Sequence, residues 1–212
     1  METWTYSLSF LTPVSIFSGQ AVAGMVDRRV MRNSQGLPTI PGSTIKGRWR
    51  YSATRLLSSV TSLPSGLTLH GRNDPMCKDS SNACTICKLF GNPAMSSAIW
   101  VGQAKLESSL KRDFKRLLEK NSNPVMSADT ELRPGIGLSR KRRCPMPDHL
   151  FHDEVLPAGI CFKGKIKICT ELSREEKDFL LVAARLMDKL GARKSVGRGI
   201  LETGMIIQQE TH

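Results

Sequence analysis

The fold is decided by a strand followed directly by a helix, in the stretch ICFKGKIKICTELSREEKDFLLVAARLMDKLG, residues Ile160–Gly191. Between Ile160 and Cys169, apolar and mostly basic residues alternate, which predicts a strand with one buried face and a second face that meets solvent or RNA. Ser173 and Glu176 form a capping box, and the apolar stripe that follows predicts a helix ending at Gly191. The stretch therefore predicts an α+β domain.

Elements of the same two kinds lie on both sides of this stretch. Period-2 alternation or short apolar runs predict further strands, and an apolar stripe of helical spacing predicts further helices. A stop and an N-cap over Pro41–Ser43 open the first of these helices. The predicted strands are Thr3–Phe10, Ala98–Leu106 and Ile200–Ile207, and the predicted helices are Thr44–Ser59 and Ser108–Lys120. The order β, α, β, insertion, β, α, β is compatible with a ferredoxin-like or RNA-recognition fold.

Composition and charge limit the class of protein. With 212 residues, 40% of them hydrophobic and 24% charged, the chain suits one compact domain and excludes a disordered or fibrous protein. Lys and Arg exceed Asp and Glu by 31 to 19, a formal net charge of +12. Such a charge attracts polyanions over long range, so nucleic acid is the leading partner.

The chain offers no expected membrane or secretory segment. The longest stretch without a charged residue, Thr3–Val26, is interrupted by polar residues, Gly and Pro, and Glu2 opposes a signal peptide. We therefore expect a cytoplasmic protein with no membrane partner. In a reducing cytoplasm, its six cysteines are better interpreted as thiols or metal ligands than as disulfides.

A cysteine-rich segment, residues 61–97, has little hydrophobic periodicity, so something other than a core must order it. Zinc bound by three cysteines and a histidine would do so. The candidate ligands are His70, Cys77, Cys84 and Cys87. Three reduced cysteines are the alternative, and the fourth ligand is open because Cys144, His149 and His152 lie in a loop that could return. Cys161 and Cys169 suit buried or half-exposed thiols.

Residues 125–159 combine five basic residues with several Pro and Gly, a composition that suits a protruding hairpin. The start of the helix predicted over Thr44–Ser59 carries Lys46 and Arg48 beside backbone N–H groups that favour anions, so it could hold a phosphate.

Four segments then resemble one family. IPGSTIKGRWR (Ile40–Arg50) is similar to the helix-opening motif of the CRISPR-associated RAMP superfamily, CTICKLFGNP (Cys84–Pro93) to its L-F-G motif, and GARKSVGRGI (Gly191–Ile200) to its glycine-rich loop. DHLFHDEVLPAGICFKGKI (Asp148–Ile166) also resembles a segment of the family. Within the superfamily, the chain looks most similar to the repeated backbone subunit of type III effector complexes, which polymerises along a guide RNA and cleaves bound target RNA.

This resemblance implies an architecture. It implies one RAMP domain over residues 1–212, with a ferredoxin-like palm of residues 1–60, 98–107 and 160–208. The cysteine-rich segment would be a zinc-binding insertion. Residues 108–159 would supply a helix and a hairpin thumb that presses between guide and target RNA. Other copies of the chain and other subunits of the complex would be its protein partners.

The resemblance also implies roles for individual residues. VDRRVMR (Val26–Arg32) matches the segment that carries the family's catalytic Asp, which falls on Asp27. Mg²⁺ or another divalent cation would assist the cleavage. Without the resemblance, an Asp followed by two arginines would be interpreted as a solvated ion pair. Guide-RNA contacts would come from Lys46, Arg48, Arg50, Arg193, Lys194 and Arg198, and thumb contacts from Arg133, Arg140 and Lys141.

Two other functions stay open. The chain could hold guide RNA without cutting, as backbone subunits of DNA-targeting complexes do. It could also be a guide-maturation ribonuclease, which would cut repeat RNA through His or Lys without metal. We expect His149 and His152 to be structural, because nothing in the sequence pairs them with a second catalytic group.

Overall fold

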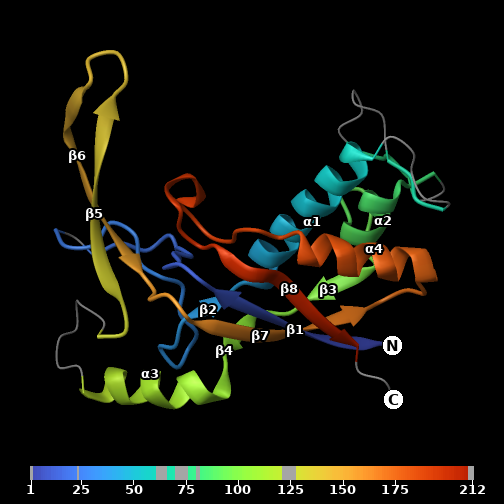
Figure 1. Ribbon diagram of the computed structural model, residues 1–212, viewed down its shortest axis with the longest axis horizontal. Helices are drawn as coiled ribbons and strands as arrows, with labels where there is room; N and C mark the ends of the chain where they lie inside the picture. Colours follow the sequence, from blue (N-terminus) through green and yellow to red (C-terminus); the bar gives the residue numbers. More distant parts are fainter. Residues whose placement is uncertain are drawn as a thin grey trace.

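The computed structural model describes residues 2–22, 24–60, 66–69, 76–79, 82–120 and 128–209. Figure 1 shows helices packed over one side of a sheet and a long hairpin standing away from it. The elements in chain order are β1 (Thr3–Phe10), β2 (Thr39–Ile40), α1 (Gly42–Ser59), α2 (Thr85–Phe90), β3 (Ile99–Val101), β4 (Ala104–Leu106), α3 (Ser108–Lys120), β5 (Glu131–Ser139), β6 (Cys144–Val155), β7 (Cys161–Ile168), α4 (Arg174–Arg185), a 3₁₀ turn (Lys194–Val196) and β8 (Leu201–Gln209).

The main sheet is antiparallel and has the order β2-β4-β7-β1-β8, with β3 also paired to β7. The strand predicted over Ala98–Leu106 is thus two short strands, β3 and β4, interrupted at Gly102 and Gln103. If these two count as one strand, the four long strands lie in the order second, third, first, fourth along the chain. With α1 and α4 as crossovers, this is the ferredoxin-like arrangement expected from the sequence.

The core lies between the sheet and the helices α1 and α4. The predicted alternation in β1 is confirmed, because Trp4 and Leu8 are fully buried while Thr5 and Ser7 are partly exposed. Trp49 of α1 is also fully buried, and its indole N–H donates to the carbonyl of Leu180 in α4 at 3.1 Å. One face of the sheet is therefore covered by helices, and the other carries the polar residues of each strand.

The first helix begins earlier than predicted. Ser43 is not its N-cap: Pro41 is, and the amides of Thr44 and Ile45 both donate to the Pro41 carbonyl. The cause is tertiary, since the helix start lies against β3. A Cβ on Gly42 would lie 2.0 Å from the carbonyl oxygen of Val101, so only glycine permits this approach.

The fourth helix ends earlier than predicted, at Arg185 instead of near Gly191. Its capping box between Ser173 and Glu176 is confirmed. Beyond Arg185 the backbone pairs with the residues that lead into β8 and with its first residue, since the Leu190 amide donates to the Gly199 carbonyl and the Leu201 amide to the Asp188 carbonyl. Met187 and Leu190 remain buried, so the apolar stripe continues after the helical hydrogen bonds have ended.

The predicted arm contains a two-stranded hairpin of β5 and β6, which projects from the sheet at the end of the molecule opposite α2 (Figure 1). The helix predicted over Ser108–Lys120 is confirmed as α3. The cysteine-rich segment holds a short helix, α2, that the sequence did not predict. In the described residues, no helix is both long and apolar enough to cross a membrane.

Candidate nucleic-acid interface and metal centre

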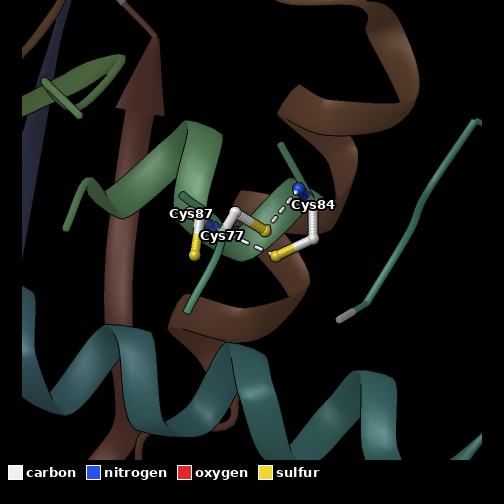
Figure 2. A group of neighbouring side chains, drawn as sticks. All are labelled: Cys77, Cys84 and Cys87. Carbon is white, nitrogen blue, oxygen red and sulfur yellow. Dashed lines mark hydrogen bonds between the residues drawn. The ribbon is translucent and has the colours of Figure 1, made fainter. Parts of the chain in front are cut away.

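Three cysteines of the cysteine-rich segment meet at the start of α2. The side chains of Cys77, Cys84 and Cys87 lie close together (Figure 2), and their Sγ atoms are all within 4.8 Å of one another. Cys84 is the N-cap of α2, and its sulfur accepts the amide of Cys87 at 3.4 Å, while the Cys84 amide donates to the Cys77 sulfur at 3.3 Å. The C-x-x-C spacing predicted from the sequence thus brings these thiols together.

The chemistry of this cluster suits a metal ion. Burial opposes ionisation of Cys87, but hydrogen bonds from the backbone of Cys77 and from Asn92 outweigh it and hold the pKa of this thiol below its usual value. Zinc in a structural site is bound tetrahedrally by four ligands, which are cysteine thiolates or histidine nitrogens. The cysteines could therefore hold a metal ion with one further ligand.

The predicted fourth ligand, His70, lies outside the described residues. The alternatives Cys144, His149 and His152 all belong to β6, in the hairpin at the opposite end of the molecule (Figure 1). The structure therefore does not bring the hairpin side chains to the cysteines.

Asp27 lies in the loop beside β6. Its backbone amide donates to the His152 carbonyl at 3.0 Å, and the His152 amide donates to the Asp27 Oδ2 atom at 2.6 Å. The next residue continues this alignment, because the backbone of Arg28 forms a parallel β-bridge with that of Asp153. The Asp27 side chain is exposed, so the hairpin holds a carboxylate in place on the surface.

Asp153 joins the glycine-rich loop to this region. Its side chain is fully buried, and it forms ion pairs with Arg28 at 3.6 Å, Arg193 at 3.3 Å and Arg198 at 3.1 Å. The guanidinium groups of Arg28 and Arg193 both lie over the Phe151 ring, 4.9 and 4.4 Å from its centroid. The Asp27 loop, the base of β6 and the glycine-rich loop therefore form one connected site.

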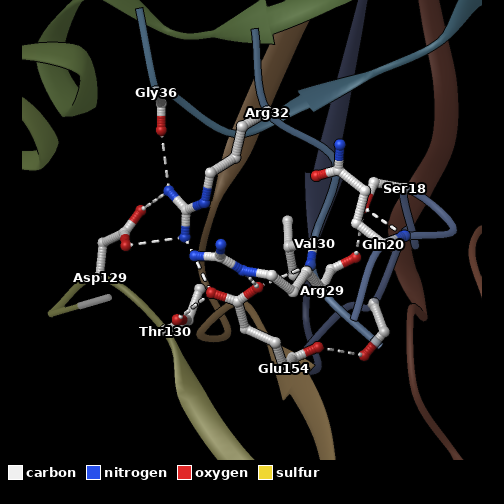
Figure 3. Close-up of polar contacts among 10 residues, drawn as sticks. Ser18, Gln20, Arg29, Val30, Arg32, Gly36, Asp129, Thr130 and Glu154 are labelled. Carbon is white, nitrogen blue, oxygen red and sulfur yellow. Dashed lines mark hydrogen bonds and ion pairs between the residues drawn. The ribbon is translucent and has the colours of Figure 1, made fainter. Parts of the chain in front are cut away.

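A second buried network fixes the base of the hairpin, as Figure 3 shows. Arg32 makes two hydrogen bonds to Asp129, at 2.8 and 2.9 Å, and one to Glu154 at 3.1 Å. Burial opposes the charge on Arg32, but the two carboxylates outweigh burial and raise its pKa. Glu154 also accepts the Val30 amide and the Thr130 hydroxyl, both at 2.7 Å. The start of β5 and the end of β6 are thus both joined to the loop that carries Asp27.

Sequence reasoning missed the buried carboxylates of these two networks. Asp129, Asp153 and Glu154 are 5%, 0% and 3% exposed, in a chain where acidic residues are outnumbered. The available signal was the DEV run at the end of β6, where two acidic residues precede a strictly apolar pair. Buried acidic side chains require partners, and the arginines of the VDRRVMR segment and the glycine-rich loop supply them.

The helix-start residues brace α1 against its neighbours. Lys46 donates to Ser97 at 2.6 Å, and burial lowers the pKa of its amine. Arg50 donates to the Gly91 carbonyl at 2.8 Å. Arg48 forms an ion pair with Asp188 and lies over the Tyr51 ring. Lys46, Arg50, Gly91 and Asn92 also line a shallow hollow of about 370 Å³, where the helix-opening and L-F-G segments meet.

The remaining predicted RNA contacts are at the surface. Lys194 begins the 3₁₀ turn of the glycine-rich loop and is exposed. Arg140 and Lys141 lie in the exposed turn at the tip of the hairpin, whereas Arg133 is part of β5 and pairs with Glu131 at 3.0 Å. Ile136, Leu138 and Leu150 leave apolar side chains exposed on the same hairpin. The hairpin thus offers both basic and apolar side chains away from the core.

Comparison with known proteins agrees with the resemblance found in the sequence. A search of curated proteins gives no match. A family model described as RAMP superfamily matches residues 7–202, which include the helix-opening segment, the L-F-G segment, the hairpin and the glycine-rich loop. Membership implies a CRISPR-associated, RNA-binding protein. The chain belongs to the RAMP superfamily.

Proposed function

We propose that this chain is the repeated backbone subunit of a type III CRISPR effector complex, and that it cleaves target RNA paired to the guide. The observation that carries the proposal is the position of Asp27. Its exposed carboxylate accepts the His152 amide of β6, and the arginines of the glycine-rich loop pair with the next residue of that strand, Asp153. An RNA strand at this junction would have its phosphates near the arginines and its sugar near the carboxylate.

Guide RNA would be held by the six basic residues of the helix start and the glycine-rich loop, from Lys46 to Arg198. Most of them already make intramolecular contacts, and this arrangement fixes their positions before RNA binds. A guanidinium group has five N–H donors, so an arginine that bonds to Asp153 keeps donors for a phosphate. The hairpin would act as the thumb, with Arg133, Arg140 and Lys141 against the RNA.

For cleavage, Asp27 would accept the proton of the target 2′-hydroxyl as the 2′-oxygen attacks the adjacent phosphorus. The bond from phosphorus to the 5′-oxygen breaks, which gives a 2′,3′-cyclic phosphate and a 5′-oxygen that takes a proton from water. The neighbouring Asp153 is buried and paired with three arginines, so it does not compete for this role. Mg²⁺ is usually held by one or two carboxylates together with substrate phosphates, which fits Asp27 facing an RNA backbone. When bound, the cation would stabilise the charge that develops on the phosphate.

The cysteine cluster would hold a structural Zn²⁺. Cys77, Cys84 and Cys87 supply three thiolates, and we propose His70 as the fourth ligand. The metal would fix the segment before α2, and α2 in turn packs against α1. This site would stabilise the L-F-G segment beside the helix start without taking part in cleavage.

One observation favours the second function, a guide-binding subunit that does not cut. The Asp27 Oδ2 atom already accepts the His152 amide, so the carboxylate has a structural role whether or not it is catalytic. In that case, Asp27 would only align the loop with the hairpin.

Cleavage by the assembled complex distinguishes these functions. The complex with its guide is incubated with complementary RNA in Mg²⁺ or in EDTA. The proposal expects evenly spaced products in Mg²⁺ and none in EDTA. Binding without cleavage in either buffer would favour the non-catalytic subunit, and cutting of free repeat RNA in EDTA would favour the guide-maturation ribonuclease.

A further inference from the structure

The face of the main sheet opposite α1 and α4 is basic. On this face, the hydroxyl side chains of β1 lie directly beside the lysines of β7. Thr3 pairs with Lys167, Thr5 with Lys165 and Ser7 with Lys163. On the other side of β7, Lys105 of β4 pairs with Lys163. All four lysines are exposed. Small polar side chains and lysines thus share one surface.

The lysines of β7 form a regular row. Because residues two apart on a strand face the same side, successive lysines lie about 6.6 Å apart along β7. This row runs along a hollow of about 810 Å³ whose described lining residues include no carboxylate. Lys163 pairs with Glu107 at the edge of the hollow. The row presents repeated positive charges at a spacing that suits consecutive phosphates of an extended strand.

Trp100 adds an aromatic side chain to this surface. It pairs with Lys167 in the sheet, its side chain is 53% exposed, and the Lys167 ammonium lies 5.4 Å from its ring centroid. An exposed tryptophan in a strand is not explained by packing, because its neighbours Ile99 and Val101 fill the core. Bases stack on such rings irrespective of sequence, and cations beside them hold the phosphates.

We propose that this face, defined by Trp100, Lys105, Lys163, Lys165 and Lys167 and called here the lysine face, binds a single strand of RNA. It is separated by the sheet from α1, whose first turns carry proposed guide contacts, so it is a second RNA surface rather than part of the first. Four lysines with one aromatic ring favour a polyanion over a second protein, whose docking surface would need a larger apolar centre. The surface should be sequence-tolerant and sensitive to salt.

Tryptophan fluorescence tests the proposal on the full chain. Trp4 and Trp49 are fully buried, so quenching by a short oligouridylate reports on Trp100. We expect saturable quenching that is lost in Trp100→Phe, although this variant retains an aromatic ring and should still bind. Fluorescence anisotropy of the labelled oligonucleotide should show binding weakened about tenfold by Trp100→Ala, since stacking of one base is lost.

The lysines are tested by charge-matched pairs. Lys165→Gln/Lys167→Gln should lower the slope of log affinity against log salt by about 1.4, because each phosphate contact on a single strand contributes about 0.7. Lys111→Gln/Lys115→Gln removes the same charge from exposed positions of α3 and should leave the slope near that of wild type.

Two results would overturn the proposal. In one, the oligonucleotide binds without quenching and both lysine pairs behave alike, so RNA binds elsewhere on the chain. In the other, Trp100→Ala abolishes self-association measured by sedimentation but leaves oligonucleotide binding unchanged, so a second copy occupies the face. Neither result bears on target cleavage, and a failure of cleavage would leave the quenching result standing.

Discussion

Replacement of Arg32 by Met should strongly destabilise the protein, because it removes the cation shared by two buried carboxylates. The Arg32 side chain is 15% exposed, and the side chains of its partners Asp129 and Glu154 are 0% and 3% exposed. Breaking a buried pair by removing one partner typically costs about 3–5 kcal/mol of unfolding free energy. For a chain of this length, that corresponds to a fall in Tm of about 10 °C.

The matched control is Arg133→Met, which removes the same group from an exposed pair. Arg133 lies 3.0 Å from Glu131, close to the 3.1 Å between Arg32 and Glu154, but both partners are more than 40% exposed. Exposed pairs contribute about 0–1 kcal/mol, so this variant should melt within a few degrees of wild type. Both values are measured by thermal unfolding followed by circular dichroism.

Equal, small losses of stability in the two arginine variants would refute the reasoning about this network.

Three further predictions concern the metal centre, a surface ion pair and the start of α1. Purified protein should contain about one zinc per chain by elemental analysis, and Cys84→Ser should lose it, because a zinc site rarely holds metal after loss of one of four ligands. The ion pair with Arg48 outweighs the burial of Asp188 and lowers the pKa of its carboxyl. A lowered pKa contributes stability above the pKa of the unfolded state, and this contribution is lost as pH falls through the folded pKa, so Asp188→Asn should cost below about 1 kcal/mol at pH 7 and less at pH 3 in chemical unfolding. Gly42→Ala should destabilise by about 2 kcal/mol or more, since its Cβ would overlap a backbone oxygen of β3, whereas Gly47→Ala, in open space on the same helix, should stabilise by about 0.5–1 kcal/mol.

The elements of the fold could be predicted because their signals are local. The alternation of β1 and β7 and the capping box of α4 depend on residues close in the chain, and the structure confirms them. The two helix boundaries that were wrong depend on distant contacts. Pro41 replaces Ser43 as N-cap because β3 lies against the helix start, and α4 ends at Arg185 because the residues after it pair with β8.

The candidate site was partly predictable for the same reason. Cys84 and Cys87 are three residues apart, so their spacing alone predicted that their thiols would meet. Without the family resemblance, Arg28 and Arg29 would be interpreted as solvated partners of Asp27, but the structure gives Arg28 another partner. Arg28 pairs with Asp153, more than a hundred residues away, and local sequence carries no signal for such a pair. The roles of Asp27 and the basic residues in RNA cleavage and binding stay predictions.

Cleavage by Asp27→Asn tests the central claim most directly. Asparagine keeps a side-chain oxygen that can accept the His152 amide, so the loop beside β6 should stay in place while the charge is lost. Wild-type and variant complexes are compared for guide content, target binding and Mg²⁺-dependent cleavage of complementary RNA. The account predicts that the variant retains guide and target but loses the evenly spaced products. Equal cleavage by both complexes would contradict it and place the catalytic group elsewhere.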